Sequence, residues 1–193
     1  RTQNIEKETG LNVKEYLADL LTKQPKNPRT IYIHVPYCRK ICSFCNMNRR
    51  HVNQTIEDYH MIIIESIKKV SKYPYIQGKD FQSIYFGGGT PTTLSAVQLE
   101  AILKAIYDYL PVSPGAEVSI ETSISELTDE RLIVMQENGV NRFSVGVQTF
   151  VDRGRKMFNR VGTGEKAIKR IEEVINMGFQ NTNIDLIYNY PLQ

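Results

Sequence analysis

The chain has 193 residues, with 24 Lys and Arg against 21 Asp and Glu and a net charge of +3. This length suffices for one domain with its own hydrophobic core. The apolar fraction of 41% and the charged fraction of 23% are ordinary for a globular domain. Basic and acidic residues are interleaved, which argues against nucleic-acid binding, and no apolar run approaches the roughly 18 residues of a membrane span.

The two ends and the cysteines bear on the context of the chain. The sequence does not begin with Met and stops after Tyr190-Pro191-Leu192-Gln193, so we expect it to be a piece of a longer protein. The segment Arg1 to Leu11 is too polar for a signal peptide. The cysteines are clustered without a disulfide framework, which favours a reducing compartment, and we expect a cytoplasmic protein.

Residues 1–29 are expected to form a helix and a linker that precede the main domain of residues 30–193. The helix is predicted over about 12–21, and the linker that follows contains Lys, Gln, Asn and two prolines. We expect one apolar face of this helix to pack on the outside of the main domain. That face consists of Leu11, Tyr16, Leu17, Leu20 and Leu21.

From residue 30 onwards, strand patterns alternate with helix patterns. Strands are predicted at about 30–35, 81–86, 117–120, 142–145 and 181–187, and helices at about 55–72, 95–110, 128–138 and 163–177. Such alternation indicates right-handed βαβ units and a parallel sheet. Five strands are too few to close an eight-stranded barrel. The predicted fold class is therefore α/β, a partial (β/α)6 TIM-like barrel truncated after its fifth strand.

Two of these helices have apolar residues from which a buried stripe can be predicted. In the helix at 55–72 the predicted buried positions are Met61, Ile62, Ile64, Ile67 and Val70. In the helix at 163–177 they are Ile168, Ile171 and Ile175.

All three cysteines lie in one short stretch, Cys38, Cys42 and Cys45, with the spacing C-x3-C-x2-C. The first predicted strand leads into this stretch, and Pro36 ends the strand because it has no N–H to donate to a sheet. The cysteines therefore lie on a loop at the end of a strand, where three thiolates can converge. Soft thiolates at this spacing suit zinc or an iron–sulfur cluster.

The residues alone leave more than one metal site open. Three cysteines are one short of a closed four-cysteine site, and a [4Fe–4S] cluster held by three thiolates keeps one iron free for another ligand. A zinc site could take His34 or His51 as its fourth ligand. His34 lies between apolar strand positions, where a core histidine with satisfied hydrogen bonds is more usual than a ligand. A redox disulfide would leave an odd cysteine.

Further polar or glycine residues follow the other predicted strands. The sequence Gly87-Gly88-Gly89-Thr90 comes directly after the second strand, where glycines let the backbone approach a ligand closely. It lacks the Lys-Ser/Thr of a P-loop. Glu121 ends the third strand, Gln148 follows the fourth, and Asp185 lies in the fifth. The carboxyl ends of parallel strands are where α/β folds place their ligands.

Several motifs together resemble the radical S-adenosylmethionine (radical SAM) superfamily, in its oxygen-independent coproporphyrinogen III oxidase-like branch, which includes haem chaperones. They are YIHVPYCRKICSFC, YFGGGTPTTL, SIE, FSVGVQTF, Asn159-Arg160 and NIDLIYNYP. The resemblance implies a [4Fe–4S] cluster that cleaves S-adenosylmethionine reductively and starts radical chemistry on an organic substrate. A porphyrin or other tetrapyrrole would be the substrate of this oxidoreductase, and flavodoxin or ferredoxin its low-potential electron donor. The alternatives are a haem-binding chaperone without turnover and a radical SAM methyltransferase.

The resemblance also implies roles for individual residues. Cys38, Cys42 and Cys45 would hold the cluster, and Tyr32, Gly88 and Glu121 match positions that contact S-adenosylmethionine. The remaining matches line the same cavity, and they are Phe44, Gly89, Thr90, Gln148, Arg160 and Asp185. Arg160 is a candidate partner for a carboxylate, although Arg160 and Asp185 could instead form a buried ion pair. Tyr32 could instead serve only in strand packing.

The sequence departs from the branch at three places. Met47 stands where the porphyrinogen oxidases carry a further cysteine. The third strand ends in Glu121-Thr122-Ser123-Ile124 instead of the usual Glu-x-Asn/Asp-Pro, and Tyr188-Asn189-Tyr190-Pro191 replaces a glycine-containing loop. These departures leave the substrate and the exact reaction open.

Overall fold

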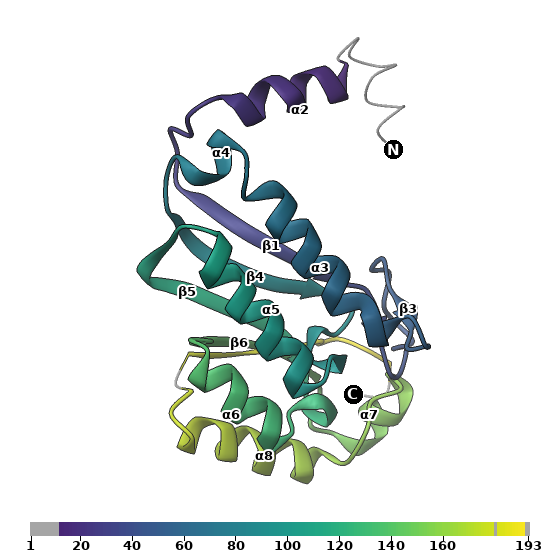
Figure 1. Ribbon diagram of the computed structural model, residues 1–193. Coiled ribbons are helices and arrows are strands. Elements are labelled where there is room, and N and C mark those ends of the chain that lie inside the picture. The colour runs from purple at the N-terminus through teal and green to yellow at the C-terminus, as the bar shows by residue number, and fades with distance from the viewer. Residues whose placement is uncertain (1–11, 180, 192–193) are drawn as a thin grey trace.

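The computed structural model describes residues 12–179 and 181–191, and its centre is one parallel sheet (Figure 1). The strand order is β1-β4-β5-β6-β7, which follows the order of the sequence. The strands are β1 (Arg29–Val35), β4 (Phe81–Gly88), β5 (Val112–Ser123), β6 (Arg142–Gln148) and β7 (Thr182–Leu186). All four neighbouring pairs are parallel. The predicted α/β partial barrel of five strands is therefore confirmed.

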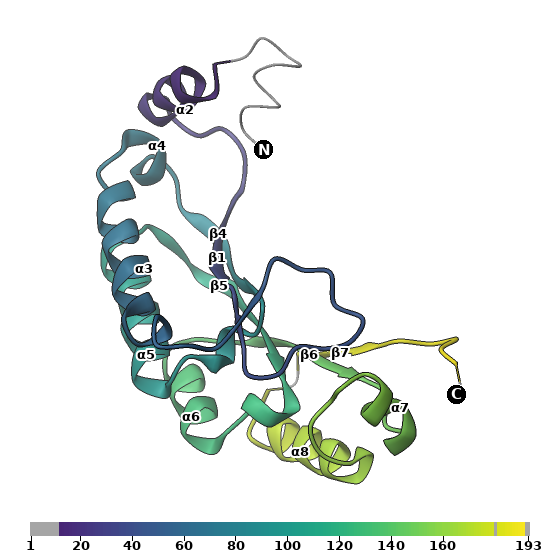
Figure 2. The ribbon, with the colours of Figure 1, turned by 90° about the vertical axis from the view of Figure 1, so that its right-hand side faces the viewer.

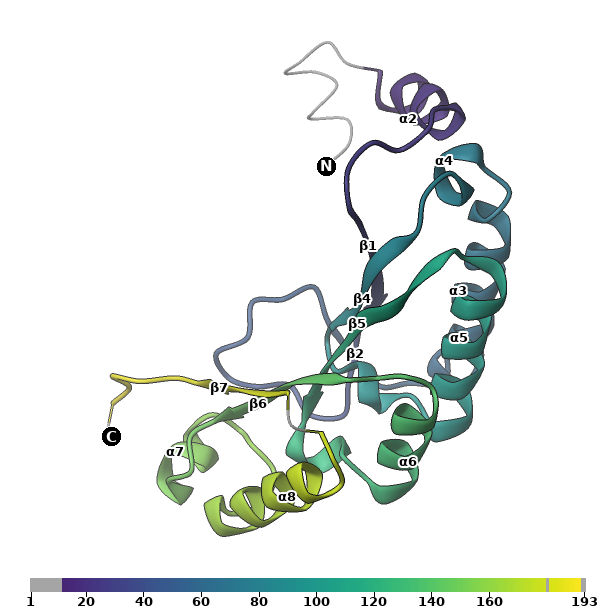
Figure 3. The same cartoon turned by 90° about the vertical axis from the view of Figure 1, so that its left-hand side faces the viewer.

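Helices follow the strands and cover one side of the curved sheet, while the loop after β1 lies on the other side (Figures 2 and 3). The helices are α3 (Ile56–Val70), α4 (Pro74–Gln77), α5 (Ala96–Tyr109), α6 (Asp129–Glu137), α7 (Asp152–Met157) and α8 (Gly164–Asn176). Two 3-10 turns, η1 (Pro91–Thr93) and η2 (Ile124–Glu126), lie at strand ends. A second small sheet joins β2 (Tyr37–Cys38) to β3 (Arg50–His51).

The two faces of the main sheet differ because side chains alternate along a strand. On the helix side, apolar side chains are fully buried, and they include Ile84, Phe86, Ile120, Val145 and Val147. The opposite face carries polar side chains that pair across neighbouring strands. Thr30 pairs with Ser83 at 2.7 Å, and Ser144 donates to Asp185 at 3.1 Å. The open side of the partial barrel is therefore polar, which suits a ligand-binding surface.

The predicted boundaries hold for most elements. β5 begins at Val112, five residues before the predicted start, because the register shift against β4 accommodates Pro114 and Gly115. The short helix α7 was not predicted, since Asp152–Met157 has too little apolar pattern to indicate a helix. β6 ends at Gln148, three residues after its predicted end, and the remaining predicted strands and helices match the observed ones to within two residues at each end.

The predicted buried stripes were partly wrong. In α3 the buried residues are Ile63 and Ile67, while Met61, Ile62 and Val70 are 55%, 60% and 37% exposed. Successive helix positions are rotated by about 100°, so Met61 and Ile62 cannot share the face of Ile63.

The same error occurs in α8. Its buried positions are Ala167, Ile171 and Val174, and Ile168 and Ile175 are exposed. The small side chain of Ala167 gave no signal of burial, whereas the larger Ile168 beside it did.

The predicted N-terminal helix is confirmed as α2 (Val13–Thr22), and its predicted packing is partly right, because Leu20 and Leu21 are half-buried and the helix contacts α4. No residue of α2 is buried, and Tyr16 and Leu17 are 50% and 47% exposed. The helix lies beside α4, beyond the end of the sheet from which β1 starts (Figure 1). Leu11 of the predicted apolar face lies outside the described residues. The division of the chain at residue 30 stays a prediction.

Among residues 12–179 and 181–191, no helix combines the length and the apolar character needed to cross a membrane.

Candidate active site

The carboxyl ends of the strands surround a cavity of about 570 Å³. It is lined by every predicted site residue except Tyr32. These residues are Cys38, Cys42, Phe44, Cys45, Gly88, Gly89, Thr90, Glu121, Gln148, Arg160 and Asp185. They come from all five strands or the loops that follow them, so the parallel topology brings together residues that are far apart in the sequence.

The base of the cysteine loop is held by backbone hydrogen bonds. Pro36 ends β1, and its carbonyl accepts from the N–H of Arg50 at 2.7 Å, which closes the loop into the β2–β3 pair. The N–H of Thr90 donates to the carbonyl of Tyr37 at 2.8 Å and joins the loop to the end of β4. The loop is thus fixed at both ends.

Each cysteine has a polar neighbour. The Thr90 hydroxyl lies 3.5 Å from the sulfur of Cys38, and Arg160 donates to the sulfur of Cys42 at 3.0 Å. Arg49 donates to the carbonyl of Cys45 at 2.7 Å. Burial raises the pKa of the Cys38 thiol, and the hydrogen bond from Thr90 opposes that rise. Arg49 and Arg160 place two guanidinium groups at this loop.

The donor set distinguishes between the metal sites left open by the sequence. The three cysteines are free thiols. In the described part of the chain, no three His, Cys, Asp or Glu side chains meet closely enough to hold one metal ion. A zinc ion needs all its donors within about 2.3 Å of one point, whereas each thiolate of a cluster binds a different iron. The three free thiols on one loop are a donor set that fits a cluster with one iron left open.

Gly88 and Gly89, at the end of β4, are needed because a side chain at either position would clash with residues 34–37. Gly88 has φ +118°, and a Cβ there would lie 2.7 Å from Cε1 of His34. A Cβ on Gly89 would lie 2.7 Å from the carbonyl oxygen of Tyr37. The predicted reason for these glycines was approach to a ligand. Their first role in the structure is to let the ends of β1 and β4 meet, while both still line the cavity.

The carboxylate of Glu121 is fixed by two donors. The hydroxyl of Tyr85 donates to Oε1 at 2.7 Å, and the N–H of Gly88 donates to Oε2 at 3.0 Å. Burial, followed by the bond to Glu121, raises the pKa of Tyr85 strongly, so the phenol remains a donor at neutral pH. The result is a negative charge held at a set position in the cavity wall.

Tyr32 lies on the same polar face but outside the cavity lining. Its ring stacks on that of Tyr85 at 6.1 Å, and its hydroxyl lies 3.1 Å from Nδ1 of His34. The side chain is 54% exposed, and Tyr85 lies directly opposite it on β4, so the stacking is cross-strand packing of the kind considered from the sequence. His34 was expected to be a satisfied core histidine, and this is only half right. Among the described residues its buried Nε2 has no hydrogen-bond partner.

Arg160 and Asp185 do not form the ion pair considered from the sequence. Besides Cys42, Arg160 donates to the carbonyl of Gly146. Asp185 accepts from Ser144 and from Asn183, the latter at 2.8 Å. Both side chains line the cavity, but each forms hydrogen bonds with its own set of partners.

Sequence reasoning missed several residues that shape the cavity. Tyr85 could have been found, because it alternates with the buried Ile84 and Phe86 and therefore faces the polar side. Arg155 could not, since nothing local shows that a 2% exposed guanidinium binds four backbone carbonyls. Those acceptors are in Val147, Thr149, Val161 and Gly162.

The fold and the site together define a cofactor-binding α/β partial barrel. The profile of the Radical SAM superfamily matches residues 32–193. The chain belongs to the radical SAM superfamily, whose cofactors are a [4Fe–4S] cluster and S-adenosylmethionine, and the cofactor prediction is confirmed at that level.

Two curated relatives and one solved structure illustrate the similarity. The heme chaperone HemW of Lactococcus lactis is 36% identical over 169 residues, which cover 87% of this chain and 43% of the relative. The oxygen-independent coproporphyrinogen III oxidase of Escherichia coli is 32% identical over 174 residues, or 90% of this chain and 38% of the relative.

The structure of coproporphyrinogen III oxidase (HemN) from Escherichia coli superposes with a TM-score of 0.85 at 30% identity. The match covers 95% of this chain and 42% of that one. The chain thus spans about two fifths of the length of the relatives it matches.

Proposed function

We propose that the chain is the cofactor-binding part of a radical SAM enzyme of the coproporphyrinogen dehydrogenase-like branch. A small organic molecule is its substrate, a tetrapyrrole is the proposed class, and a low-potential protein is its reductant. The observation that carries the proposal is the fixed carboxylate of Glu121 in the cavity that the three thiols line. The free thiols also fit the reducing cytoplasm as the place of action.

Cys38, Cys42 and Cys45 are the proposed ligands of the cluster. When reduced and bound to S-adenosylmethionine, the cluster supplies the electron that cleaves the sulfonium C–S bond. Arg160 holds Cys42 in place through its bond to the sulfur. Thr90 does the same for Cys38. A half-buried side chain that hydrogen-bonds to a metal ligand orients that ligand, as such partners do in other metal sites.

The remaining predicted residues are proposed contacts of S-adenosylmethionine. The Glu121 carboxylate accepts hydrogen bonds from the ammonium or the ribose hydroxyls of that cofactor, and Asp185 offers a second acceptor. Gln148, which has the unusual φ of +70°, presents an amide to the same cavity. Phe44 supplies a half-exposed ring for stacking, and Tyr32 extends the polar wall beyond the cavity.

A haem-binding chaperone without turnover is the second candidate, and one feature favours it. Met47 lines the cavity where the porphyrinogen oxidases carry a further cysteine. The relative that is 36% identical is named a heme chaperone. Absorbance titration of the full-length protein with haem separates the two candidates. A chaperone binds haem stoichiometrically and shows no substrate conversion, whereas an enzyme of this branch consumes S-adenosylmethionine.

The test is reductive cleavage by the full-length protein, reconstituted without oxygen and supplied with dithionite and S-adenosylmethionine. We expect 5′-deoxyadenosine and methionine in equal amounts. Glu121→Gln should raise the KM for S-adenosylmethionine at least tenfold, because a hydrogen bond to a charged group contributes about 1.5–3 kcal/mol. Glu117→Gln is the control, since Glu117 lies outside the cavity on the same strand. Intact cluster with no cleavage by the wild type would refute the proposal.

A further inference from the structure

We infer that Glu126 is a positioning residue, whose buried carboxylate holds the cysteine loop, residues 38–51, in a fixed place relative to Glu121. It acts through Arg39, which follows the first cysteine of the loop. The inference rests on the proposed function, because it concerns the geometry between the cluster held by the loop and the S-adenosylmethionine contacted by Glu121.

Glu126 is the buried member of a network of three charged side chains. Its side chain is 5% exposed, and it lies at the end of η2, shortly after Glu121 in the chain. Oε2 accepts from Nε of Arg39 at 3.1 Å and lies 3.6 Å from Nη1 of Arg131. One carboxylate therefore binds two guanidinium groups, one from the cysteine loop and one from α6.

The network also includes the turn η1, which follows β4. Nη2 of Arg39 lies 3.4 Å from the carbonyl oxygen of Thr93. The hydroxyl of Thr93 donates to the carbonyl of Thr90 at 2.8 Å, and the Thr90 hydroxyl lies 3.5 Å from the sulfur of Cys38. These contacts form a ring that begins and ends beside the first cysteine, so the cysteine loop is tied to the ends of both β4 and β5.

The two arginines of the network differ in burial. The side chain of Arg131 is 11% exposed, and it also donates to the backbone carbonyls of Leu94 at 2.8 Å and of Glu126 at 3.1 Å. The side chain of Arg39 is 53% exposed. Arg131 is thus part of the rigid base, whereas Arg39 is the link to the cysteine loop. Removing Arg39 leaves Glu126 with a cationic neighbour.

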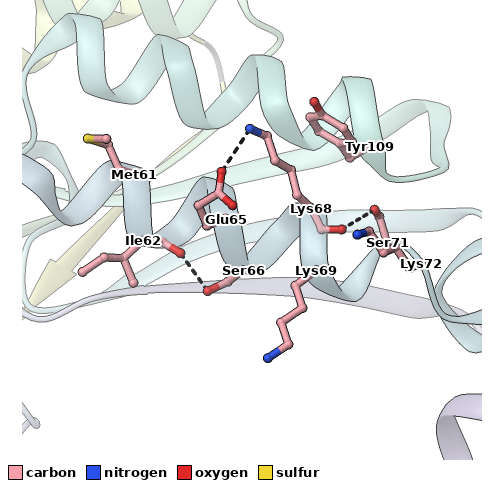
Figure 4. A pocket seen from close by; sticks show the side chains of 9 residues that line it. All are labelled: Met61, Ile62, Glu65, Ser66, Lys68, Lys69, Ser71, Lys72 and Tyr109. Atoms are coloured by element: carbon pink, nitrogen blue, oxygen red, sulfur yellow. Dashed lines mark hydrogen bonds and ion pairs between the residues drawn. The ribbon is translucent and has the colours of Figure 1, made fainter.

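Other ion pairs in the described part of the chain lack these features. Apart from Glu126, every acidic side chain in them is at least 36% exposed. An example lies in the wall of a groove of about 820 Å³ on the outer side of α3 and α5, where Lys68 and Glu65 pair at 3.0 Å within one helix (Figure 4). The desolvation cost of a buried carboxylate offsets much of the gain from its ion pair. The main effect of the Glu126 network is therefore on geometry.

This geometry bears on the proposed reaction. Cleavage of S-adenosylmethionine depends on its orientation toward the cluster, since a displacement of about 1 Å can lower a rate roughly 100-fold. The donors that fix Glu121 are Tyr85 and Gly88, and neither belongs to the network. Loosening the link through Arg39 should therefore lower kcat for 5′-deoxyadenosine formation and leave KM for S-adenosylmethionine nearly unchanged.

The test compares Arg39→Ala, Glu126→Gln and the double variant of the full-length reconstituted protein, with dithionite as reductant. Arg39→Ala should lower kcat about tenfold and change KM less than about twofold. Its Tm should change by less than about 2 °C, because Arg39 is half-exposed and Glu126 keeps Arg131. The double variant should be no slower than Glu126→Gln, because both residues act through one contact.

Arg142→Ala is the matched control for the loss of an arginine. Arg142 pairs with Glu117 at 3.0 Å, its side chain is 45% exposed, and both residues lie outside the cavity. Its kcat should stay within about twofold of the wild type.

Hydrogen exchange measured by mass spectrometry follows the cysteine loop without any turnover. The N–H groups of Arg50 and Val52 close the loop by donating to the carbonyls of Pro36 and Cys38 at 2.7 and 3.0 Å. The peptide that contains these two groups should exchange at least about fivefold faster in Arg39→Ala than in the wild type, and Arg142→Ala should leave it unchanged.

A raised KM with unchanged kcat in Arg39→Ala would mean that Arg39 contacts S-adenosylmethionine itself, and this result would overturn the inference. Unchanged hydrogen exchange, or additive losses of kcat in the double variant, would overturn it as well. Absence of cleavage by the wild type overturns the proposed function but leaves the exchange comparison intact, so the two failures are distinguishable.

Discussion

Arg160 donates a hydrogen bond from Nη1 to the sulfur of Cys42 at 3.0 Å, although 118 residues separate them in the sequence. Neighbouring residues make the same connection. Asn159 donates to the carbonyl of Ile41 at 2.7 Å, and Ser43 donates to that of Met157 at 2.9 Å. The segment that follows α7 therefore holds the cysteine loop against the end of β6.

Replacing Arg160 should loosen this connection. Arg160→Ala loses the bonds to Cys42 and to Gly146, and we expect a loss of about 1.5–3 kcal/mol in the free energy of unfolding. Arg160→Lys should recover only part, because an ammonium lacks the planar fork that reaches both acceptors. Chemical denaturation of the full-length protein measures the loss, and iron retention after gel filtration should fall in parallel.

Arg153→Ala is the control for that experiment, because Arg153 is an exposed arginine on α7 and lies outside the cavity. Equal losses in the Arg153 and Arg160 variants would show that the contact to Cys42 contributes nothing specific.

Gly88→Ala should destabilise the end of β4. The residue has φ +118°, and the added Cβ would lie 2.7 Å from His34 and 2.9 Å from the carbonyl oxygen of Val35. Backbone strain and the clash together should cost about 2–4 kcal/mol. Gly115→Ala isolates the strain, since Gly115 has φ +76° with nothing within 4 Å, and it should cost about 1 kcal/mol. Urea denaturation giving the same loss for both would contradict the close approach.

The pH dependence of the unfolding free energy should reveal the raised pKa of Tyr85. Burial and the bond to Glu121 raise its pKa above the ordinary value of 10.0. Above pH 10 the unfolded state loses the phenol proton while the folded state keeps it, so this contribution is complete below pH 10 and declines as pH rises.

The measurement is the difference in unfolding free energy between the wild type and Tyr85→Phe. It should shrink as pH rises from about 9 to 11. Tyr188→Phe, at an 84% exposed position, should give no such trend. If the free-energy difference between the wild type and Tyr85→Phe stayed constant over this pH range, the raised pKa of the Tyr85 phenol would be contradicted.

Arg155→Met should be among the most destabilising substitutions in the chain. It leaves four backbone carbonyls without their donor, two of them in fully buried bonds, at Val147 and Thr149. A loss of about 3–5 kcal/mol in unfolding free energy is expected. Arg155→Lys should rescue less than half, because three donors on one nitrogen cannot reach carbonyls on both sides. Thermal denaturation measures the loss in both variants. Full rescue by Lys would contradict the role of the planar guanidinium group in reaching carbonyls on both sides.

Much of the fold and the cavity could be predicted because both follow from periodicity and topology. Alternating strands and helices dictate a parallel sheet, and a parallel sheet gathers the strand ends. For that reason Cys38, Glu121, Gln148 and Asp185 were predicted to lie together, and the structure brings them into one cavity.

The partners of those residues could not be predicted, since they depend on register and on loop geometry. Arg160 lines the cavity as predicted, but its partners there are Cys42 and Gly146 and not Asp185. Ile62 and Ile168 were expected to be buried, because apolar character alone does not give the angle of a side chain on its helix.

The central claim is that Cys38, Cys42 and Cys45 hold one [4Fe–4S] cluster. The most direct measurement is the content of iron, acid-labile sulfide and zinc in the anaerobically reconstituted full-length protein and in its triple Cys→Ser variant. The account predicts about four irons and four sulfides per wild-type chain and a loss of both in the variant. One zinc without sulfide, or undiminished iron in the variant, would contradict it.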